Sequence, residues 1–370
     1  MKIVQIINGL QIGGAEKLIM DLHQGYLRRG NDSVIVSLTG SDHGWSGKGL
    51  YSLGLSSPYD LRVLPRLFAG IEETAMNHAD IIHSHLFPAQ LYTAVLREIS
   101  QLSCQFVTTE HGTLNRRRGS ITGRVIDRWQ YSCYDRIFCV SHGAGNELGN
   151  WIPELVNRIE VIYNGIDIQK FSAARIFRSE PPFTILSIGS LRDKKNYTTA
   201  IKAFAILRSR ISLDVRFRIA GEGILKSTLE QQVKELGLES DIEFLGNVED
   251  VAQLLHSSDI FFMPSSSEAF GIAAVEAMAS GLPVVVSDIP GMAEVVGKND
   301  CCGMLVNPAS PDHMAGALQY LIENRNRASV MGTEGLNRAA TFSIEKTVDK
   351  YLRAYEGILN EGHYEDKNDA

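Results

Sequence analysis

The sequence has no uninterrupted apolar run of the roughly 18 residues that a membrane-spanning helix needs, so we do not expect the chain to cross a bilayer. We also expect no signal peptide. The opening residues, MKIVQIINGL, have one lysine and no small-residue cleavage site, and they fit a first buried strand better. Only five cysteines are present, without CxxC spacing. This argues against a disulfide framework or a structural zinc site and predicts a reducing, cytoplasmic location.

Basic charge is scarce as well. The chain holds 36 lysines and arginines against 43 aspartates and glutamates, a net charge of −7. Binding to nucleic acid calls for a basic surface that neutralises phosphates, so no nucleic-acid partner is expected. Residues 116–136 depart from this balance, because they carry six arginines against two aspartates.

Short β-type runs alternate with helical patterns along most of the chain, beginning with KIVQII, AEKLIMDLHQGYLRRG and SVIVSL. This order is typical of a parallel sheet covered by helices. The pattern is interrupted at about residues 172–182, which are polar and end in two prolines, and then restarts with TILSIGS. We therefore predict two doubly wound α/β domains, residues 1–172 and 173–343, with the ligand crevice at the carboxyl ends of the strands. An amphipathic helix at residues 344–361 follows.

The stretch SSSEAFGIAAVEAMASGLPVV, residues 265–285, holds two carboxylates. Glu268 precedes a predicted helix that contains Glu276, and the two lie roughly 12 Å apart along the helix axis. That exceeds the separation of about 5 to 9.5 Å in a glycosidase acid pair, so two separate contacts with one long ligand are predicted. Between them, the N–H groups of Phe270, Gly271 and Ile272 lie at a helix N-terminus, which favours phosphate. An ordinary capped helix with a solvent-facing glutamate explains the stretch equally well.

Two other loops follow predicted strands. Gly13 and Gly14 come after the first strand and open the first helix, where α/β folds often bind phosphate, although a tight turn is an equal alternative. In SIGSLRDKKN, the cations Arg192, Lys194 and Lys195 can neutralise a leaving diphosphate. A solvated basic loop is the alternative there.

Histidines lie at the ends of two predicted strands of the first domain. His111, in TTEHGT, is expected to point toward the crevice and to donate to a sugar hydroxyl or to developing charge, although a lone histidine is more often structural. His83 and His85, in DIIHSH, share one face of a strand. No third ligand is evident in the sequence nearby, so no metal site is predicted.

Together these stretches resemble the large family-4 retaining glycosyltransferases of the GT-B fold, which transfer a sugar from a nucleotide sugar. The resemblance implies two Rossmann-like domains facing across a cleft, and a C-terminal helix that packs back on the first domain. The stretch that begins at residue 267 is the most specific match. The matches lie in order over about residues 1–340: GGAEK at 13–17, EHG at 110–112, VIYNGID at 161–167, GSLRDKKN at 189–196, AGEG at 220–223 and SEAFGIAAVEAMASGLPVV from 267.

The resemblance assigns roles within the most specific stretch. Glu276 would hold the ribose hydroxyls, and Glu268 would face the transferred sugar near its reacting carbon. The N–H groups around Phe270, Gly271 and Ile272 would bind phosphate and sugar.

It also assigns roles in the other loops. Lys195 would be a phosphate-binding lysine, Gly14 would meet the diphosphate, and His111 would contact the donor sugar. The family commonly has arginine immediately after the glycine of GRL, whereas this chain has Ser190. Arg192 is the candidate to supply the missing charge.

The implied reaction retains the anomeric configuration. No carboxylate is clearly placed as a covalent nucleophile, so we favour same-face attack in which the leaving diphosphate takes the acceptor proton, stabilised by Lys195, Arg192 and the helix N-terminus. Neither a metal nor another cofactor is expected. A sugar-nucleotide epimerase of similar fold and a non-catalytic nucleotide-sugar-binding protein are the alternatives.

The expected donor is a UDP- or GDP-sugar, and the expected acceptor is a glycan or a lipid-linked glycan in bacterial surface polysaccharide synthesis. Arg116, Arg117 and Arg118 begin the basic segment, which also contains aliphatic and aromatic residues. Such a segment can lie on an anionic membrane surface as a peripheral contact, bind an acidic acceptor, or form a solvated helix.

Overall fold

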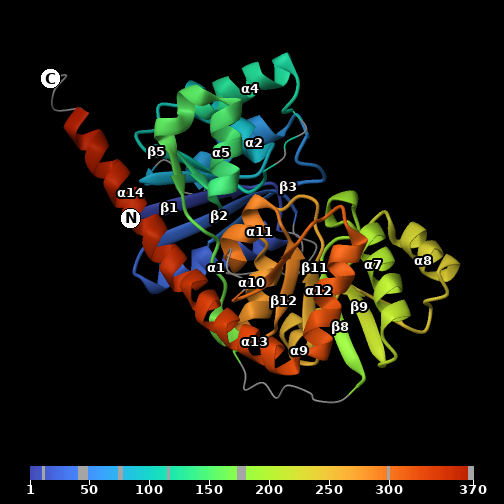
Figure 1. Ribbon diagram of the computed structural model, residues 1–370. Helices are drawn as coiled ribbons and strands as arrows, with labels where there is room; N and C mark the ends of the chain where they lie inside the picture. The colour runs from blue at the N-terminus through green and yellow to red at the C-terminus, as the bar shows by residue number, and fades with distance from the viewer. Residues whose placement is uncertain are drawn as a thin grey trace. The chain divides into compact units, whose positions relative to one another are not determined.

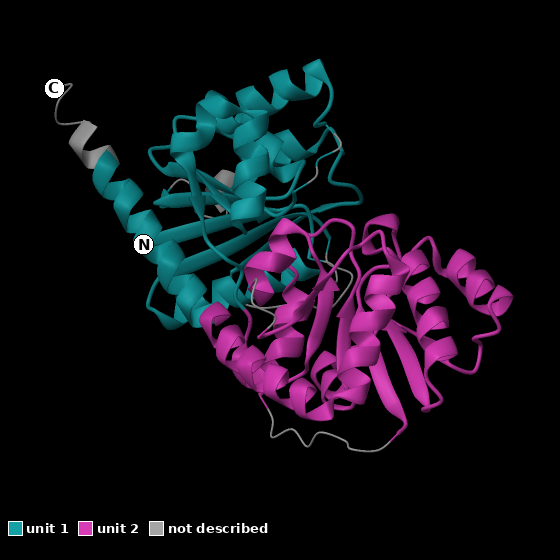
Figure 2. Cartoon of the chain, viewed as in Figure 1, with its two compact units in different colours: residues 1–165, 344–370 teal, residues 166–343 magenta. Residues whose placement is uncertain are grey.

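The computed structural model divides the chain into two compact units, Met1–Gly165 with Ile344–Ala370, and Ile166–Ser343 (Figure 2). None of the helices in the described part of the chain is both long and apolar enough to span a bilayer. The residues described are 1–10, 13–40, 49–73, 78–113, 115, 117–172, 181–297 and 301–365.

The first unit is built on a seven-stranded parallel sheet with the order β3-β2-β1-β4-β5-β6-β7 (Figure 1). Its strands are β1 (Lys2–Ile7), β2 (Asp32–Thr39), β3 (Leu50–Leu55), β4 (Ile81–His85), β5 (Gln105–Glu110), β6 (Arg136–Cys139) and β7 (Ile159–Val161). Its helices are α1 (Gly14–Arg28), α2 (Val63–Glu73), α3 (Ala89–Ile99), α4 (Ile121–Ser132), α5 (His142–Trp151), the 3-10 helix η2 (Pro153–Arg158) and α14 (Ile344–Glu365).

The second unit is built on a six-stranded parallel sheet with the order β10-β9-β8-β11-β12-β13. Its strands are β8 (Phe183–Ile188), β9 (Val215–Ala220), β10 (Ile242–Gly246), β11 (Ile260–Met263), β12 (Val284–Ser287) and β13 (Met304–Val306). Its helices are α6 (Ile168–Phe171), η3 (Asp193–Lys195), α7 (Tyr197–Arg210), α8 (Lys226–Glu235), α9 (Val251–His256), α10 (Ile272–Ala279), α11 (Pro290–Val296), α12 (Pro311–Glu323), α13 (Arg325–Ala339) and η4 (Ala340–Phe342).

The strand orders confirm the predicted fold class of two Rossmann-like domains. Numbered within each unit, the first six strands follow the order 3-2-1-4-5-6, and the order reverses between β1 and β4 and between β8 and β11. Central strands such as β4 and β12 are buried at every position, because helices cover both faces of a parallel sheet. Ligands of such sheets bind at the point where the strand order reverses.

The boundary between the units lies after Gly165 rather than at the expected 172/173. The reason is that α6 packs against α10 and buries Phe171 within the second unit. Of the polar segment predicted as the linker, residues 173–180 lie outside the described residues.

The C-terminal helix α14 completes the core of the first unit by packing on α1. Its buried residues Val348, Tyr351 and Tyr355 share a cluster with Tyr26 of α1. The hydroxyl groups of Tyr26 and Tyr355 are 3.1 Å apart, so the two helices also share a buried hydrogen bond.

Gly25→Ala tests this helix contact. The added Cβ would lie 2.4 Å from Cγ2 of Val348, and the resulting overlap should lower the free energy of unfolding by about 1–3 kcal/mol. Gly357→Ala on the exposed side of α14 is the matched control, because a Cβ there meets nothing within 4 Å. Because alanine has a higher helix propensity than glycine, Gly357→Ala should be more stable than the parent by up to about 1 kcal/mol. Urea unfolding measures both variants, and a Gly25→Ala variant as stable as the parent would contradict the packing.

Candidate functional site

In the second unit, the point where the strand order reverses brings two of the predicted site residues together. Lys195 ends the turn after β8, and Glu268 lies in the loop after β11, 73 residues further along the chain. The Lys195 Nζ donates to Oε2 of Glu268 at 2.5 Å, and both side chains are largely buried. This is a charge-assisted hydrogen bond, which is stronger than one between neutral groups.

Hydrogen bonds to backbone carbonyls hold these loops in place beside the ion pair. The N–H of Ser266 donates to the carbonyl of Lys194 at 2.9 Å. The side-chain amide of Asn196 donates to the carbonyls of Pro264 and Pro308 at 3.1 and 2.8 Å. Lys195 is therefore positioned between anchored neighbours.

The AGEG stretch, residues 220–223, lies against the backbone of the loop after β8. Gly221 has a φ of 141°, and a Cβ there would lie 2.2 Å from the carbonyl oxygen of Gly189. A Cβ on Gly223 would lie 2.4 Å from the carbonyl oxygen of Leu191. Both glycines are therefore required by close backbone approach.

Ser190 and Arg192 lie on the same loop as Lys195. The N–H of Arg192 donates to the carbonyl of Ser190 at 2.8 Å, and the N–H of Lys195 donates to the carbonyl of Arg192 at 2.9 Å. Ser190 is half-buried, whereas the Arg192 side chain is exposed. The exposed guanidinium is thus on the loop where the family commonly has its arginine.

The helix after Glu268 begins where the sequence predicts. Gly271 precedes α10 with a φ of 85°, and a Cβ there would lie 1.9 Å from Cε of Met292. Phe270 is buried, with its ring stacked edge-on against Phe342 at 5.3 Å, so only its backbone can meet a ligand. The first N–H groups of a helix have no partner within the helix and favour an anion, and Ile272 is the first residue of α10.

Glu276 lies one turn into α10 and is only 6% exposed. Burial is unusual for a carboxylate and requires hydrogen-bond donors around it. Glu276 is therefore not the solvent-facing glutamate that the alternative of an ordinary capped helix predicts.

In the first unit, the predicted glycine loop precedes α1. Gly13 is the N-cap of this helix, and a Cβ there would lie 2.2 Å from Oε2 of Glu16. Burial raises the pKa of the Glu16 carboxyl. Gly14, the first residue of α1, is exposed.

The structure brings His111 next to His85, a contact that the sequence reasoning missed. Strands β4 and β5 are paired in parallel, so the end of β4 and the loop after β5 lie at the same sheet edge. Nδ1 of His85 and Nε2 of His111 are 3.2 Å apart. Nδ1 of His83 lies 2.6 Å from the hydroxyl of Tyr355, and its Nε2 lies 2.7 Å from Oγ1 of Thr109.

Burial keeps these imidazoles neutral. It lowers the pKa of His83 and His85 well below the ordinary value, and it lowers the pKa of His111 to about 4. Among the described residues, no group of three His, Cys, Asp or Glu side chains is arranged to hold a metal ion.

Two of the three arginines predicted to meet an acceptor or a membrane are paired within the first unit. Arg117 Nε donates to Oδ1 of the buried Asp127 at 2.6 Å. Arg118 lies 3.5 Å from Oε2 of Glu110. Both guanidinium groups are mostly buried, so they do not form an open basic surface, and Arg116 lies outside the described residues.

Helix α4 exposes an apolar stripe instead. Ile121, Val125 and Trp129 recur every four residues and are 86%, 64% and 39% exposed. Residues four apart lie on one face of a helix. Arg124 and Arg128 are exposed beside this stripe, which makes α4 the amphipathic surface of the basic segment.

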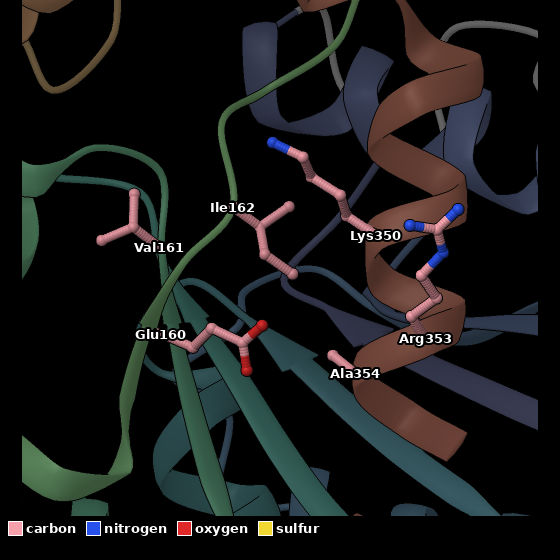
Figure 3. Close-up of a pocket in the computed structure, with 6 residues that line it drawn as sticks. All are labelled: Glu160, Val161, Ile162, Lys350, Arg353 and Ala354. Atoms are coloured by element: carbon pink, nitrogen blue, oxygen red, sulfur yellow. The ribbon is translucent and has the colours of Figure 1, made fainter. Parts of the chain in front are cut away.

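A separate cavity of about 360 Å³ lies between the edge strand β7 and α14 (Figure 3). Glu160, Val161 and Ile162 line one side, and Lys350 and Arg353 project from the helix on the other. The cavity contains none of the predicted site residues.

Comparison with known proteins identifies the family. The family described as "Glycosyl transferases group 1" matches residues 169–338, and that described as "Glycosyltransferase Family 4" matches residues 12–170. An uncharacterized glycosyltransferase of Methanocaldococcus jannaschii is 31% identical over 286 residues, 75% of this chain and 76% of that protein. The chain therefore belongs to the family-4, group 1 glycosyltransferases.

A second relative and a solved structure were also found. The N-acetyl-alpha-D-glucosaminyl L-malate synthase of Bacillus anthracis is 27% identical over 328 residues, 86% of this chain and 83% of that protein. The fold matches the crystal structure of Anabaena HepE in complex with UDP and glucose, with a TM-score of 0.81 and 19% identity over 96% of this chain and 100% of that chain.

Acidification should destabilise the protein through its buried histidines. In the unfolded chain, His83 and His85 titrate near the ordinary pKa of about 6.5, whereas their pKa values in the folded protein are lower. The unfolded chain therefore binds more protons below about pH 6.5. Stability should fall there by at most about 1.4 kcal/mol per pH unit for each histidine.

Urea unfolding at a series of pH values measures this slope. His83→Gln should make it shallower. Equal slopes for the parent and His83→Gln would show that His83 does not carry the effect.

Proposed function

We propose that this glycosyltransferase uses a UDP- or GDP-sugar as donor and transfers the sugar with retention of configuration. The observation that carries the proposal is the Lys195–Glu268 ion pair at the point of strand reversal, next in the chain to the N-terminus of α10 and the buried Glu276. A cation, the first N–H groups of a helix and a buried carboxylate are the groups that a sugar, a diphosphate and a ribose require. The complex of Anabaena HepE with UDP and glucose supports this choice of donor.

Each of these residues has a proposed role in binding. Glu276 accepts hydrogen bonds from the ribose hydroxyls. The N–H groups at Phe270, Gly271 and Ile272 bind phosphate and sugar, and Glu268 faces the transferred sugar.

A lysine ammonium has three N–H donors, so the bond to Glu268 leaves others for phosphate oxygens. Glu268 thereby orients Lys195 as well as facing the sugar. Arg192 adds a second cation from the same loop.

We propose same-face attack, in which the leaving diphosphate accepts the acceptor proton. Negative charge develops on the diphosphate as its bond to the anomeric carbon breaks, before the proton arrives, and preorganised donors lower the energy of that state. Lys195, Arg192 and the start of α10 supply these donors, while Gly14 allows the diphosphate to approach the backbone and His111 donates to a sugar hydroxyl. These groups do the work of a divalent cation, so we propose catalysis without a metal or another cofactor.

We propose a glycan or lipid-linked glycan acceptor, and a cytoplasmic enzyme that attaches peripherally to the membrane in bacterial surface polysaccharide synthesis. The apolar stripe of α4, flanked by Arg124 and Arg128, supports a membrane contact. A helix of this kind buries its apolar face at the headgroup boundary of an anionic bilayer. Arg117 supports that helix through its ion pair with Asp127, whereas Arg118 pairs with Glu110 of β5.

Glu276→Ala should weaken binding of the cognate nucleoside diphosphate about 10- to 100-fold, because hydrogen bonds to a charged group contribute about 1.5–3 kcal/mol. Glu268→Gln should reduce sugar transfer more than binding. Titration calorimetry with UDP and GDP measures binding by both variants, and release of free sugar from the cognate nucleotide sugar measures the activity of Glu268→Gln. Glu230→Ala, an exposed position on α8, is the control. If Glu276→Ala binds as tightly as the parent, the ribose assignment fails.

Membrane attachment is tested by flotation with anionic liposomes at low salt. Val125→Glu should reduce the bound fraction several-fold, because a carboxylate at the centre of the stripe opposes burial and the lipid charge. Val330→Glu is the matched control on α13, where the parent valine is also exposed. If the parent protein does not float with the liposomes, the membrane proposal is wrong.

Sugar transfer should be unchanged by EDTA, because Lys195 and the helix N-terminus take the place of a cation. Loss of activity on EDTA treatment that manganese restores would defeat the metal-free mechanism.

A further inference from the structure

We propose that His85 is a positioning residue that fixes the tautomer of His111, so that His111 presents its N–H at Nδ1 as a hydrogen-bond donor. The two rings meet where β4 ends and the loop after β5 begins. Nδ1 of His85 lies 3.2 Å from Nε2 of His111, and their ring centroids are 5.4 Å apart. Both rings are neutral, so one of these two nitrogens carries the proton that they share.

The surroundings of His85 decide which ring donates. Its Nε2 is buried and has no hydrogen-bond partner among the residues that the structure describes. A neutral imidazole carries one N–H. If that proton were on Nε2 of His85, a buried donor would be unsatisfied, at a cost of about 1–3 kcal/mol. With the proton on Nδ1, the ring donates to His111, and only a lone pair is left without a partner.

His83 holds the His85 ring in place. The two ring centroids are 4.0 Å apart with an interplanar angle of 35°, so the rings pack against each other at a tilt. His83 itself is fixed at both nitrogens by Tyr355 of α14 and Thr109 of β5. The hydroxyl of Tyr351 lies 3.2 Å from Oγ1 of Thr109, which ties the support to α14 a second time.

The role of His111 follows from this arrangement. Its Nε2 accepts from His85, so as a neutral ring it keeps its own proton on Nδ1. A ligand therefore meets an N–H donor that suits a hydroxyl oxygen, and His111 does not act as a general base there. That the ligand is a donor sugar rests on the proposed function, whereas the tautomer does not.

Nitrogen-15 NMR of the histidine rings tests the proposal in the full-length protein without ligand. His111 should show a protonated Nδ1 and an unprotonated Nε2 at pH values near neutrality. A protonated Nε2 on His111 in the parent protein would overturn the inference without any variant being made.

Two variants separate positioning from a structural role. Asparagine at position 85 places an amide N–H near the position of Nδ1, so His85→Asn should keep the His111 tautomer and most of the activity. His85→Leu removes the donor, so it should mix the two tautomers and lower kcat about 10-fold with UDP binding unchanged. If His85→Asn behaves like His85→Leu, or if His85→Leu keeps the parent tautomer, His85 does not set the proton.

Addition of UDP-glucose and GDP-mannose to the parent separates this inference from the proposed function. A shift at His111 Nδ1 with either one supports a sugar contact. If His111 has the predicted tautomer but shows no such shift, the positioning role of His85 stands and the sugar assignment of His111 is wrong.

Discussion

Parallel strands determine where this protein can place its polar side chains. Each connection carries the chain from the carboxyl end of one strand back to the amino end of the next. The carboxyl ends of the strands in one unit therefore lie together. Lys195 and Glu268 meet because β8 and β11 are neighbours at the strand reversal. His85 and His111 meet because β4 and β5 are neighbours. The chemistry of both sheet edges depends on this constraint.

The two edges have different chemistry. The second unit has an ion pair, a helix N-terminus and a buried glutamate, held by backbone contacts that only glycine permits at Gly221 and Gly223. The first unit has neutral imidazoles, kept neutral by burial and supported from α14. Charged groups suit a diphosphate, and neutral donors suit hydroxyl groups without attracting a second anion.

Much of the fold and part of the site were predictable from sequence. Alternating strand and helix patterns predict two doubly wound domains, and glycines after strands predict the tight loops. Local sequence patterns do not determine which strands are neighbours in a sheet, so the contact of His85 with His111 could not be predicted. The neutralisation of Arg117 by Asp127 depends on how the loop before α4 folds back on that helix, although the aspartate in the same basic segment was a signal. The end of the first unit at Gly165 depends on the burial of Phe171, which a polar linker pattern does not indicate.

The proposed function requires that the enzyme bind a nucleoside diphosphate sugar and transfer the sugar with retention of its anomeric configuration. Proton NMR of the enzyme with UDP-, GDP- and ADP-sugars, followed during slow release of free sugar, tests it most directly. We expect selective binding of a UDP- or GDP-sugar and first appearance of the α-anomer from an α-linked donor. First appearance of the β-anomer, or no binding to any of these donors, would contradict it.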